Sequence, residues 1–356
     1  MDIHVIYTGG TIGMKHTTEG LVPESHVETW LDQQLAETEF EGHVHTHQLS
    51  PLIDSSNATP ATWQLIIDTI REHAAQATAF VILHGTDTLA YTASALSFAL
   101  QDLPIPVIMT GSQLPFTHDG SDALPNVIGA LHAAAQPHLR GVFVFFGHHL
   151  YQGNRTTKVS SWSFDAFDSP ATTPVAKIAD SWTWTSYNET NYPRSNRENC
   201  NSLSLNGGEK SLQPPEQFPL PLPYKNYDVI VLHITPGLTA KRLQALLTPL
   251  PRGVILRGYG TGNIPADEPG FVDVLADAAA QGCIIIASTQ TLQARVDLST
   301  YATGNALMRA GVISGEDATI EALCTKLIFL LSQKHTTEKI RILMGTPLAN
   351  ELTISR

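Results

Sequence analysis

The sequence predicts an α/β fold with two domains: a larger N-terminal α/β domain with a mostly parallel sheet and a smaller C-terminal α/β domain. Short apolar runs alternate along the chain with segments of helical spacing, the pattern of repeated strand–loop–helix units. The runs are continuously apolar, so both faces of the sheet are covered and its strands are mostly parallel. The length of 356 residues, at roughly 150 residues per domain, fits about two domains.

The elements of the first half follow from apolar runs and from helix start signals. Thr59 and Pro60 stand where the N-cap and the first turn of a helix are expected, and the apolar residues after them recur at helical spacing. Strands are predicted at residues 3–7, 80–83, 106–109 and 142–146, and helices at residues 63–73, 88–100 and 123–135.

The alternation stops near residue 181 and resumes near residue 229. The stretch between is polar and then rich in proline, which predicts a linker with a surface insertion that takes no part in catalysis. The predicted divisions are an N-terminal domain at 1–180, this linker at 181–226 and a C-terminal domain at 227–356. In the C-terminal domain, strands are predicted at residues 229–232, 254–256 and 283–286, and helices at residues 240–247, 271–280, 320–331 and 338–344.

Charge and cysteine content exclude several classes of protein. A formal net charge of −12 argues against nucleic acid or an anionic membrane surface as a partner. The cysteines, Cys200, Cys283 and Cys324, are too few and too widely spaced for a disulfide framework or a Cys-x-x-Cys zinc site. No apolar run reaches about 18 residues, and no secretory signal precedes the run that begins at Ile3. We therefore expect a cytoplasmic protein that does not enter a membrane.

Polar loops follow the predicted parallel strands at their carboxyl ends, where such sheets bind their ligands. The loops are Thr8–Gly13, His84–Thr88 and Thr110–Gln113. The first has neither the glycine spacing of a Rossmann loop nor the Gly-Lys-Ser/Thr of a Walker loop. Its glycines let the backbone approach a small ligand, and Thr11 is a candidate nucleophile. The alternative is a tight turn with no chemical role.

Side chains suited to amide chemistry gather in and around these loops. Asp87 is a candidate partner for an amino group, and Thr86 a candidate to orient a water molecule or an amide. Lys158 follows hydroxyl residues, where an amine can accept and return a proton; a solvated surface charge is the alternative. Further hydroxyl groups and a carboxylate come from Asp54–Ser56 and Ser112.

Three histidines alternate at His43, His45 and His47, a spacing that places them on one face of a strand. Metal ligation is compatible with this spacing, but no cluster of cysteine or glutamate accompanies it. We therefore expect a polar face on an edge strand, and no metal site.

Together these motifs resemble the L-asparaginase family, and most closely the cytoplasmic type I enzymes of bacteria. The resemblance covers nearly the whole chain and fails only across about residues 181–224. Its two signatures are TGGTI at residues 8–12 and HGTDT at residues 84–88. Further matching stretches are DSS at 54–56, PVIMTGSQ at 106–113, GNRTTK at 153–158 and YATGNAL at 301–307.

The resemblance implies an asparaginase/glutaminase-like fold that hydrolyses the side-chain amide of L-asparagine to L-aspartate and ammonia. It implies that Thr11 is the acyl-accepting nucleophile and that Thr86, Asp87 and Lys158 form a second group that relays protons. No metal or organic cofactor is implied.

The same resemblance assigns the substrate contacts. The α-groups of asparagine would be held by Asp54, Ser55 and Ser56, with Asp87 on the ammonium group and Ser112 beside the bound side chain. The site would lie between the subunits of an intimate dimer, and dimers would pair into a tetramer. Type I enzymes are often activated by asparagine at a second site, for which the candidates here are Arg257, Asn263, Thr157 and Tyr301.

One position departs from the family pattern. Many relatives have a tyrosine on the loop after TGGTIG that contacts the nucleophilic threonine, in a Gly-Tyr-x-Pro stretch. This chain has Leu21 there, which has no hydroxyl group. Glu19 and His16, on the same loop, are alternatives for the missing group.

Two other functions stay open at this point. The chain is compatible with the ammonia-producing subunit of a tRNA-dependent amidotransferase, although such relatives carry an additional N-terminal domain. It is also compatible with an amino-acid-binding sensor, which the missing tyrosine favours. Retention of Thr11, Thr86, Asp87 and Lys158 favours the enzyme.

Overall fold

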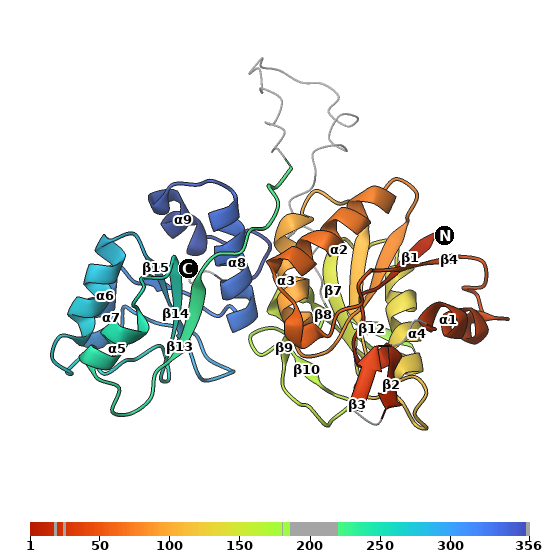
Figure 1. Ribbon diagram of the computed structural model, residues 1–356, viewed down its shortest axis with the longest axis horizontal. Coiled ribbons are helices and arrows are strands. Elements are labelled where there is room, and N and C mark those ends of the chain that lie inside the picture. The colour runs from red at the N-terminus through yellow and green to blue at the C-terminus, as the bar shows by residue number, and fades with distance from the viewer. Residues whose placement is uncertain (18–19, 24–25, 180, 186–219, 354–356) are drawn as a thin grey trace, which may run out of the picture.

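The computed structural model describes residues 1–17, 20–23, 26–179, 181–185 and 220–353, with the backbone alone for residues 15–17 and 20–23. It confirms the predicted fold class, with a larger N-terminal and a smaller C-terminal α/β domain that lie side by side (Figure 1). Within the described residues, no helix is long and apolar enough to cross a membrane.

The N-terminal domain is built on an eight-stranded sheet with the order β12-β11-β8-β7-β6-β5-β1-β4. Neighbouring strands from β4 to β7 are parallel, and β8, β11 and β12 add antiparallel strands at one edge. The strands are β1 Ile3–Tyr7, β4 Val44–Gln48, β5 Ala79–Leu83, β6 Pro106–Thr110, β7 Gly141–Phe146, β8 His149–Gln152, β11 Ala176–Ile178 and β12 Trp182–Trp184.

Helices cover both faces of this sheet, as continuously apolar strands require. One apolar cluster joins α2 (Pro60–His73) and α3 (Leu89–Ala99) to one face. A second cluster joins α1 (Val27–Leu35) and α4 (Ala123–Ala134) to the other. Alternate residues of β1, β5, β6 and β7 therefore enter different cores.

The C-terminal domain has a parallel four-stranded sheet with the order β13-β14-β15-β16. Its strands are β13 Val229–His233, β14 Gly253–Gly258, β15 Ile284–Thr289 and β16 Ile313–Ser314. Its helices are α5 Ala240–Leu246, α6 Phe271–Ala280, α7 Ala302–Arg309, α8 Ile320–Ser332 and α9 Thr337–Met344.

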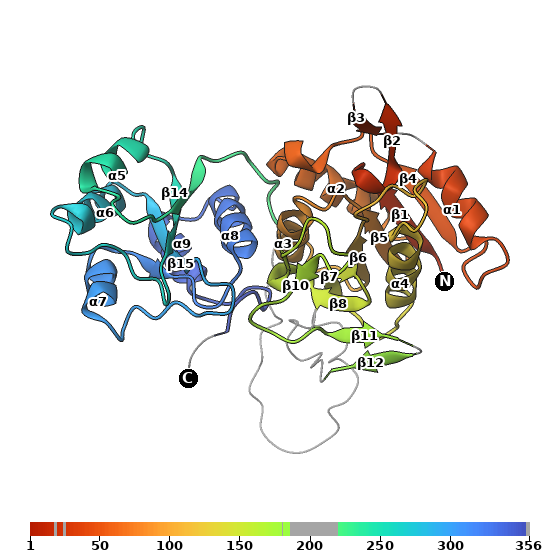
Figure 2. The same ribbon diagram turned by 90° about the horizontal axis from the view of Figure 1, so that it is seen from below.

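The two domains pack through α3 and α8, which face each other in both views (Figures 1 and 2). The rings of Phe98 and Phe329 stack there with centroids 6.0 Å apart. Arg155 donates from Nε to the carbonyl oxygen of Asn350 at 2.6 Å and pairs with Asp317 at 3.1 Å. Because these contacts are buried, the two domains share one core and are not connected by the linker alone.

The described ends of the predicted linker differ from our expectation. Trp182 and Trp184 lie in β12, at the edge of the first sheet, and Trp182 packs edge-on against Phe145 at 5.7 Å. Tyr224 is buried between the domains, and its hydroxyl donates to the carbonyl oxygen of Ala95 at 2.8 Å. Both ends are therefore ordered parts of the fold, because their aromatic side chains find apolar partners. Residues 186–219 lie outside the described part of the chain.

Candidate active site

Three loops meet at the carboxyl ends of β1 and β5, and glycine makes the meeting possible. A Cβ atom on Gly10 would lie 2.3 Å from the Cα atom of Gly85, and one on Gly9 would lie 2.3 Å from the oxygen of Ile53. A Cβ atom on Gly85 would lie 2.5 Å from the Oγ atom of Ser55. Since real Cβ atoms do not approach this closely, only glycine lets the three loops cross here. The predicted convergence of the Thr8–Gly13 and His84–Thr88 loops is thus confirmed, and a Cβ atom on Gly111 would lie 2.3 Å from the His84 oxygen, so the Thr110–Gln113 loop adjoins them as well.

Lys158 lies on a separate two-stranded ribbon, and its side chain reaches the loop that follows β5. The ribbon pairs β9 (Thr157–Lys158) with β10 (Phe167–Asp168). The Nζ atom of Lys158 donates to Oγ1 of Thr86 at 2.7 Å and to Oδ1 of Asp87 at 2.7 Å. Thr86 is 6% exposed, whereas the Asp87 side chain is 65% exposed. The amine therefore joins a buried hydroxyl to a carboxylate that faces solvent.

Thr11 begins the short 3₁₀ helix η1 (Thr11–Gly13), directly after Gly10. Thr11 is partly exposed, and its hydroxyl has no hydrogen-bond partner among the residues that the structure describes. Nearby, the backbone is fixed by a bond from Gly13 N–H to the Gly10 oxygen at 3.2 Å and by one from Phe116 N–H to the Ile12 oxygen at 2.9 Å. A hydroxyl that is uncommitted but held on a fixed backbone suits attack on a bound carbonyl carbon.

Residues Asp54–Ser56 lie on the neighbouring loop, where Asp54 caps the 3₁₀ helix η2 (Ser55–Asn57). Its Oδ1 accepts from Ser56 N–H at 3.1 Å, and both residues are exposed. Ser55 is buried, and its carbonyl oxygen accepts from the hydroxyl of Thr88 at 2.7 Å. Asp54 and Ser56 thus present polar groups to solvent, while Ser55 ties their loop to the HGTDT loop.

Ser112 is buried in the TGSQ loop, and its hydroxyl donates to the carbonyl oxygen of Leu114 at 2.5 Å. That loop is held by two side chains that sequence reasoning missed. The carboxylate of Asp122 accepts from the backbone N–H groups of Gln113 and Leu114, at 2.9 to 3.1 Å. Asn126 donates to the Gly111 oxygen at 3.0 Å and to Asp122 at 3.1 Å. Their spacing of four residues at the start of a helix was the available signal.

Gln113 is a further residue without a predicted role. Its Nε2 donates to the carbonyl oxygens of Ser160 and Ser163, at 3.3 and 3.1 Å, in the turn after Lys158. Its Oε1 lies 3.5 Å from the hydroxyl of Thr86. Gln113 therefore couples the loop after β6 to the ribbon that carries Lys158.

His84 is buried beneath the HGTDT loop. Its Nδ1 lies 2.7 Å from the oxygen of Gly85 and must donate to it, so Nε2 accepts from the hydroxyl of Thr92 at 3.0 Å. Burial lowers the pKa of His84 to about 4. The ring is therefore neutral at pH 7 and serves to fix the loop rather than to carry charge.

The residues predicted for a second, regulatory site are only partly brought together. Thr157 donates to Oε1 of the buried Glu321 at 2.7 Å, and the Arg257 charge acts on the same carboxyl group. Burial raises the pKa of Glu321, and the Arg257 charge opposes the rise. Tyr301 is half exposed ahead of α7, and the backbone of Asn263 bridges to Tyr259 in its own loop.

Leu21 and the alternating histidines, which stood out in the sequence, lie apart from these loops. Leu21 is in the hairpin of β2 (Met14–Thr17) and β3 (Gly20–Pro23), opposite His16, and its side chain lies outside the described part of the structure. The three alternating histidines do not form one cluster. His43 contacts the Met1 oxygen, whereas His47 lies beside His4 and His73.

Comparison with known proteins gives matches over both domains. The family model described as Asparaginase, N-terminal matches residues 2–191, and the one described as Glutaminase/Asparaginase C-terminal domain matches residues 228–344. L-asparaginase 1 of Escherichia coli strain K12 is 40% identical over 356 residues, which cover 99% of this chain and 98% of that protein. L-asparaginase I from Vibrio cholerae matches with a TM-score of 0.83 at 35% identity over 99% of both chains. The thermostable L-asparaginase from Thermococcus kodakarensis matches with a TM-score of 0.82 at 32% identity over 100% of both.

Proposed function

This chain belongs to the asparaginase family, and we propose that it hydrolyses the side-chain amide of L-asparagine to L-aspartate and ammonia. The observation that carries the proposal is the position of Lys158. Its amine contacts both Thr86 and Asp87 at 2.7 Å, on a loop that crosses the Gly9–Gly10 turn just before Thr11. A nucleophile, a proton relay and a carboxylate for a substrate ammonium group thus come from loops in direct contact.

The reaction divides into two steps that balance. In the first, the Thr11 oxygen bonds to the amide carbon, the carbon–nitrogen bond breaks, and the hydroxyl proton leaves with the nitrogen as ammonia. In the second, water attacks the resulting ester and regenerates the Thr11 hydroxyl and a carboxylic acid. Thr86 and Lys158 assist by moving a proton between two atoms that are already hydrogen-bonded.

The substrate's charged end is assigned to the exposed polar groups around the crossing. Asp54 and Ser56 are exposed and take the α-groups of asparagine together with Ser55, while the exposed carboxylate of Asp87 takes its ammonium group. Ser112 acts through its loop, since its hydroxyl is bonded to a backbone oxygen. No group in this scheme calls for a metal or an organic cofactor.

We further propose that the enzyme is cytoplasmic and assembles as an intimate dimer, paired into a tetramer. Activation by asparagine at a second site would involve Thr157 and Arg257, which share Glu321 as a neighbour. Tyr301 and Asn263 would join them in the assembled protein.

Ammonia release by the purified chain tests the function. We expect turnover of L-asparagine without any added protein, and we expect replacement of Lys158 by methionine to remove it. Binding of asparagine with no release would favour the sensor, and release only in the presence of a partner protein would favour the amidotransferase subunit. Either outcome overturns the proposal.

A further inference from the structure

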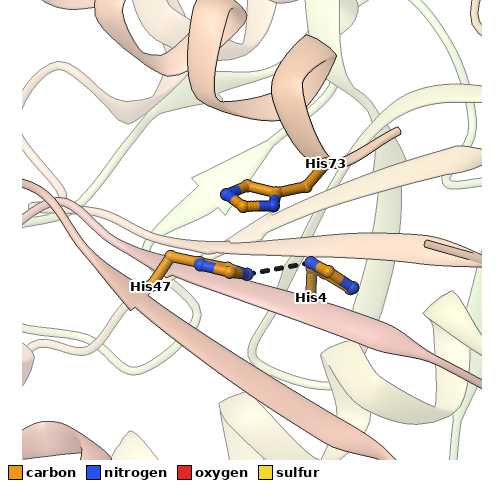
Figure 3. A group of neighbouring side chains, drawn as sticks. All are labelled: His4, His47 and His73. Carbon is orange, nitrogen blue, oxygen red and sulfur yellow. Dashed lines mark hydrogen bonds between the residues drawn. The ribbon is translucent and has the colours of Figure 1, made fainter. Parts of the chain in front are cut away.

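Three histidines from three elements converge at the far end of the N-terminal sheet. His4 is on β1, His47 is on β4, and His73 is the last residue of α2 (Figure 3). Residues 4 and 6 of β1 face α2, and so do residues 45 and 47 of the paired strand β4. The end of α2 then brings His73 over the two strand histidines.

Their ring nitrogens are close enough to share one ion. The Nδ1 atom of His4 lies 2.8 Å from Nε2 of His47, and the rings of His47 and His73 stack with centroids 4.0 Å apart. One nitrogen from each of the three rings lies within 4.8 Å of the others. Tetrahedral zinc with Zn–N bonds of about 2.0–2.1 Å separates its nitrogen ligands by roughly 3.3 Å. In such a site the 2.8 Å contact would open by about half an ångström, and the other nitrogens, which lie within 4.8 Å of one another, would close.

The protonation state of the rings also suits a metal. The hydrogen bond between His4 and His47 requires one ring to accept, so the two rings cannot both be protonated. At least one of the two rings is therefore neutral and carries a lone pair on the side where they meet.

The surroundings favour a cation. Asp2 and His45 line the same pocket as the three rings, and the Asp2 charge acts on His4. The Glu72 charge acts on His47 from the end of α2. Carboxylate charge thus acts on the nitrogen donors, and no lysine or arginine lines the pocket among the described residues.

We propose that His4, His47 and His73 bind one Zn²⁺ ion, with a water molecule completing the tetrahedron. Nitrogen donors of this kind select zinc and its neighbours over magnesium and calcium, which prefer oxygen. This replaces the expectation from sequence that the chain has no metal site. The ion joins β1, β4 and the end of α2, and its ligand on β1, His4, stands near the start of that strand, whereas Thr11 follows the strand's end. Its role is therefore to stabilise the edge of the sheet, and it takes no part in the reaction.

Calorimetric titration of the untagged, chelator-treated protein with ZnCl₂ tests this site. We expect one equivalent of Zn²⁺ to bind and to raise the melting temperature, because a ligand that binds only the folded state stabilises it. Substituting Co²⁺ for Zn²⁺ should give the visible absorption spectrum of a tetrahedrally coordinated ion. His47→Ala and His73→Ala should each weaken binding roughly 100-fold or more, since changes even beyond the direct ligands cost about 10–100-fold.

His43→Ala is the matched control, because His43 precedes β4 and, among the residues that the structure describes, its ring hydrogen-bonds to the Met1 oxygen rather than to the three clustered histidines. It should bind Zn²⁺ as the parent does, and the melting temperatures of the metal-free variants check that each one folds. The proposal is overturned if the parent binds no stoichiometric Zn²⁺, or if His73→Ala binds it unchanged. Equal loss in His43→Ala and His73→Ala also overturns it, since that result indicates loose surface chelation. None of these outcomes depends on asparagine hydrolysis.

Discussion

The amine of Lys158 lies 2.7 Å from the hydroxyl oxygen of Thr86, although 72 residues separate them along the chain. Thr86 sits at the carboxyl end of β5 in the main sheet, and Lys158 sits in the small β9–β10 ribbon beside it. The ribbon thus delivers a charged group to a buried hydroxyl that the main sheet positions.

Lys158→Met should lower kcat for asparagine by about 10²–10⁴-fold, the usual contribution of a positioned proton-transfer group. Methionine keeps the length of the side chain and removes only the amine, so the fold should persist. Lys177→Met is the control, because Lys177 is exposed on β11. Steady-state ammonia release measures both variants. A Lys158 variant that keeps the parent's kcat would remove the relay from the mechanism.

Thr11→Ala and Thr86→Ala should each abolish nearly all hydrolysis, because groups that act as a unit lose most of their effect when one is removed. Each hydroxyl stands at a strand end next to glycine residues that cannot supply another. Thr69→Ala is the control, since Thr69 bonds only to its own helix. Retention of more than about a tenth of kcat by either variant, at an unchanged melting temperature, contradicts the assignment.

His84 should make the protein labile to acid. Its pKa is about 4 in the folded protein and near 6.5 when unfolded, so the unfolded state binds the extra proton first. Stability is therefore unaffected above pH 6.5 and falls as the pH drops from 6.5 toward 4. The melting temperature of His84→Gln should fall less steeply over that range, because glutamine can bond to Gly85 and Thr92 without taking a proton. Parallel curves for the two proteins would show that His84 is not responsible.

Leu21→Tyr should raise or preserve kcat. If a hydroxyl at this position assists the nucleophile, as the resemblance to the family implies, the gain reaches about 10²-fold only where no other group already acts. The backbone at this position forms a regular antiparallel pair with His16, which accepts tyrosine as readily as leucine. The measurement is kcat on asparagine at several pH values. A collapse of kcat with asparagine binding intact would mean that leucine is an adapted part of this site.

The central strands of the main sheet could be predicted from the sequence, whereas its antiparallel edge strands could not. Strands β1, β5, β6 and β7 follow continuous apolar runs, which is the strongest signal that a buried parallel strand gives. Strands β8, β11 and β12 are short, pair antiparallel at an edge and mix polar with apolar residues, so periodicity does not mark them. Helix α7 was missed as well, because only one side of it meets the core.

The same division holds for the site. Loops at the carboxyl ends of neighbouring parallel strands meet by topology, so Thr11, Thr86 and Asp87 could be grouped from sequence. The contacts of Gln113 depend on how loops fold over one another, and no local pattern encodes that. The three-histidine cluster was missed for the same reason, since its members come from positions 4, 47 and 73.

Partitioning with hydroxylamine shows whether asparagine is hydrolysed through an ester on Thr11. L-asparagine and the β-methyl ester of L-aspartate should pass through one common intermediate on the enzyme. At a fixed hydroxylamine concentration, both substrates should therefore give the same ratio of aspartyl hydroxamate to aspartate, and Thr11→Ala should form neither product from asparagine. Different ratios from the two substrates, or hydroxamate formed from asparagine by Thr11→Ala, would show that hydrolysis does not proceed through an ester on Thr11.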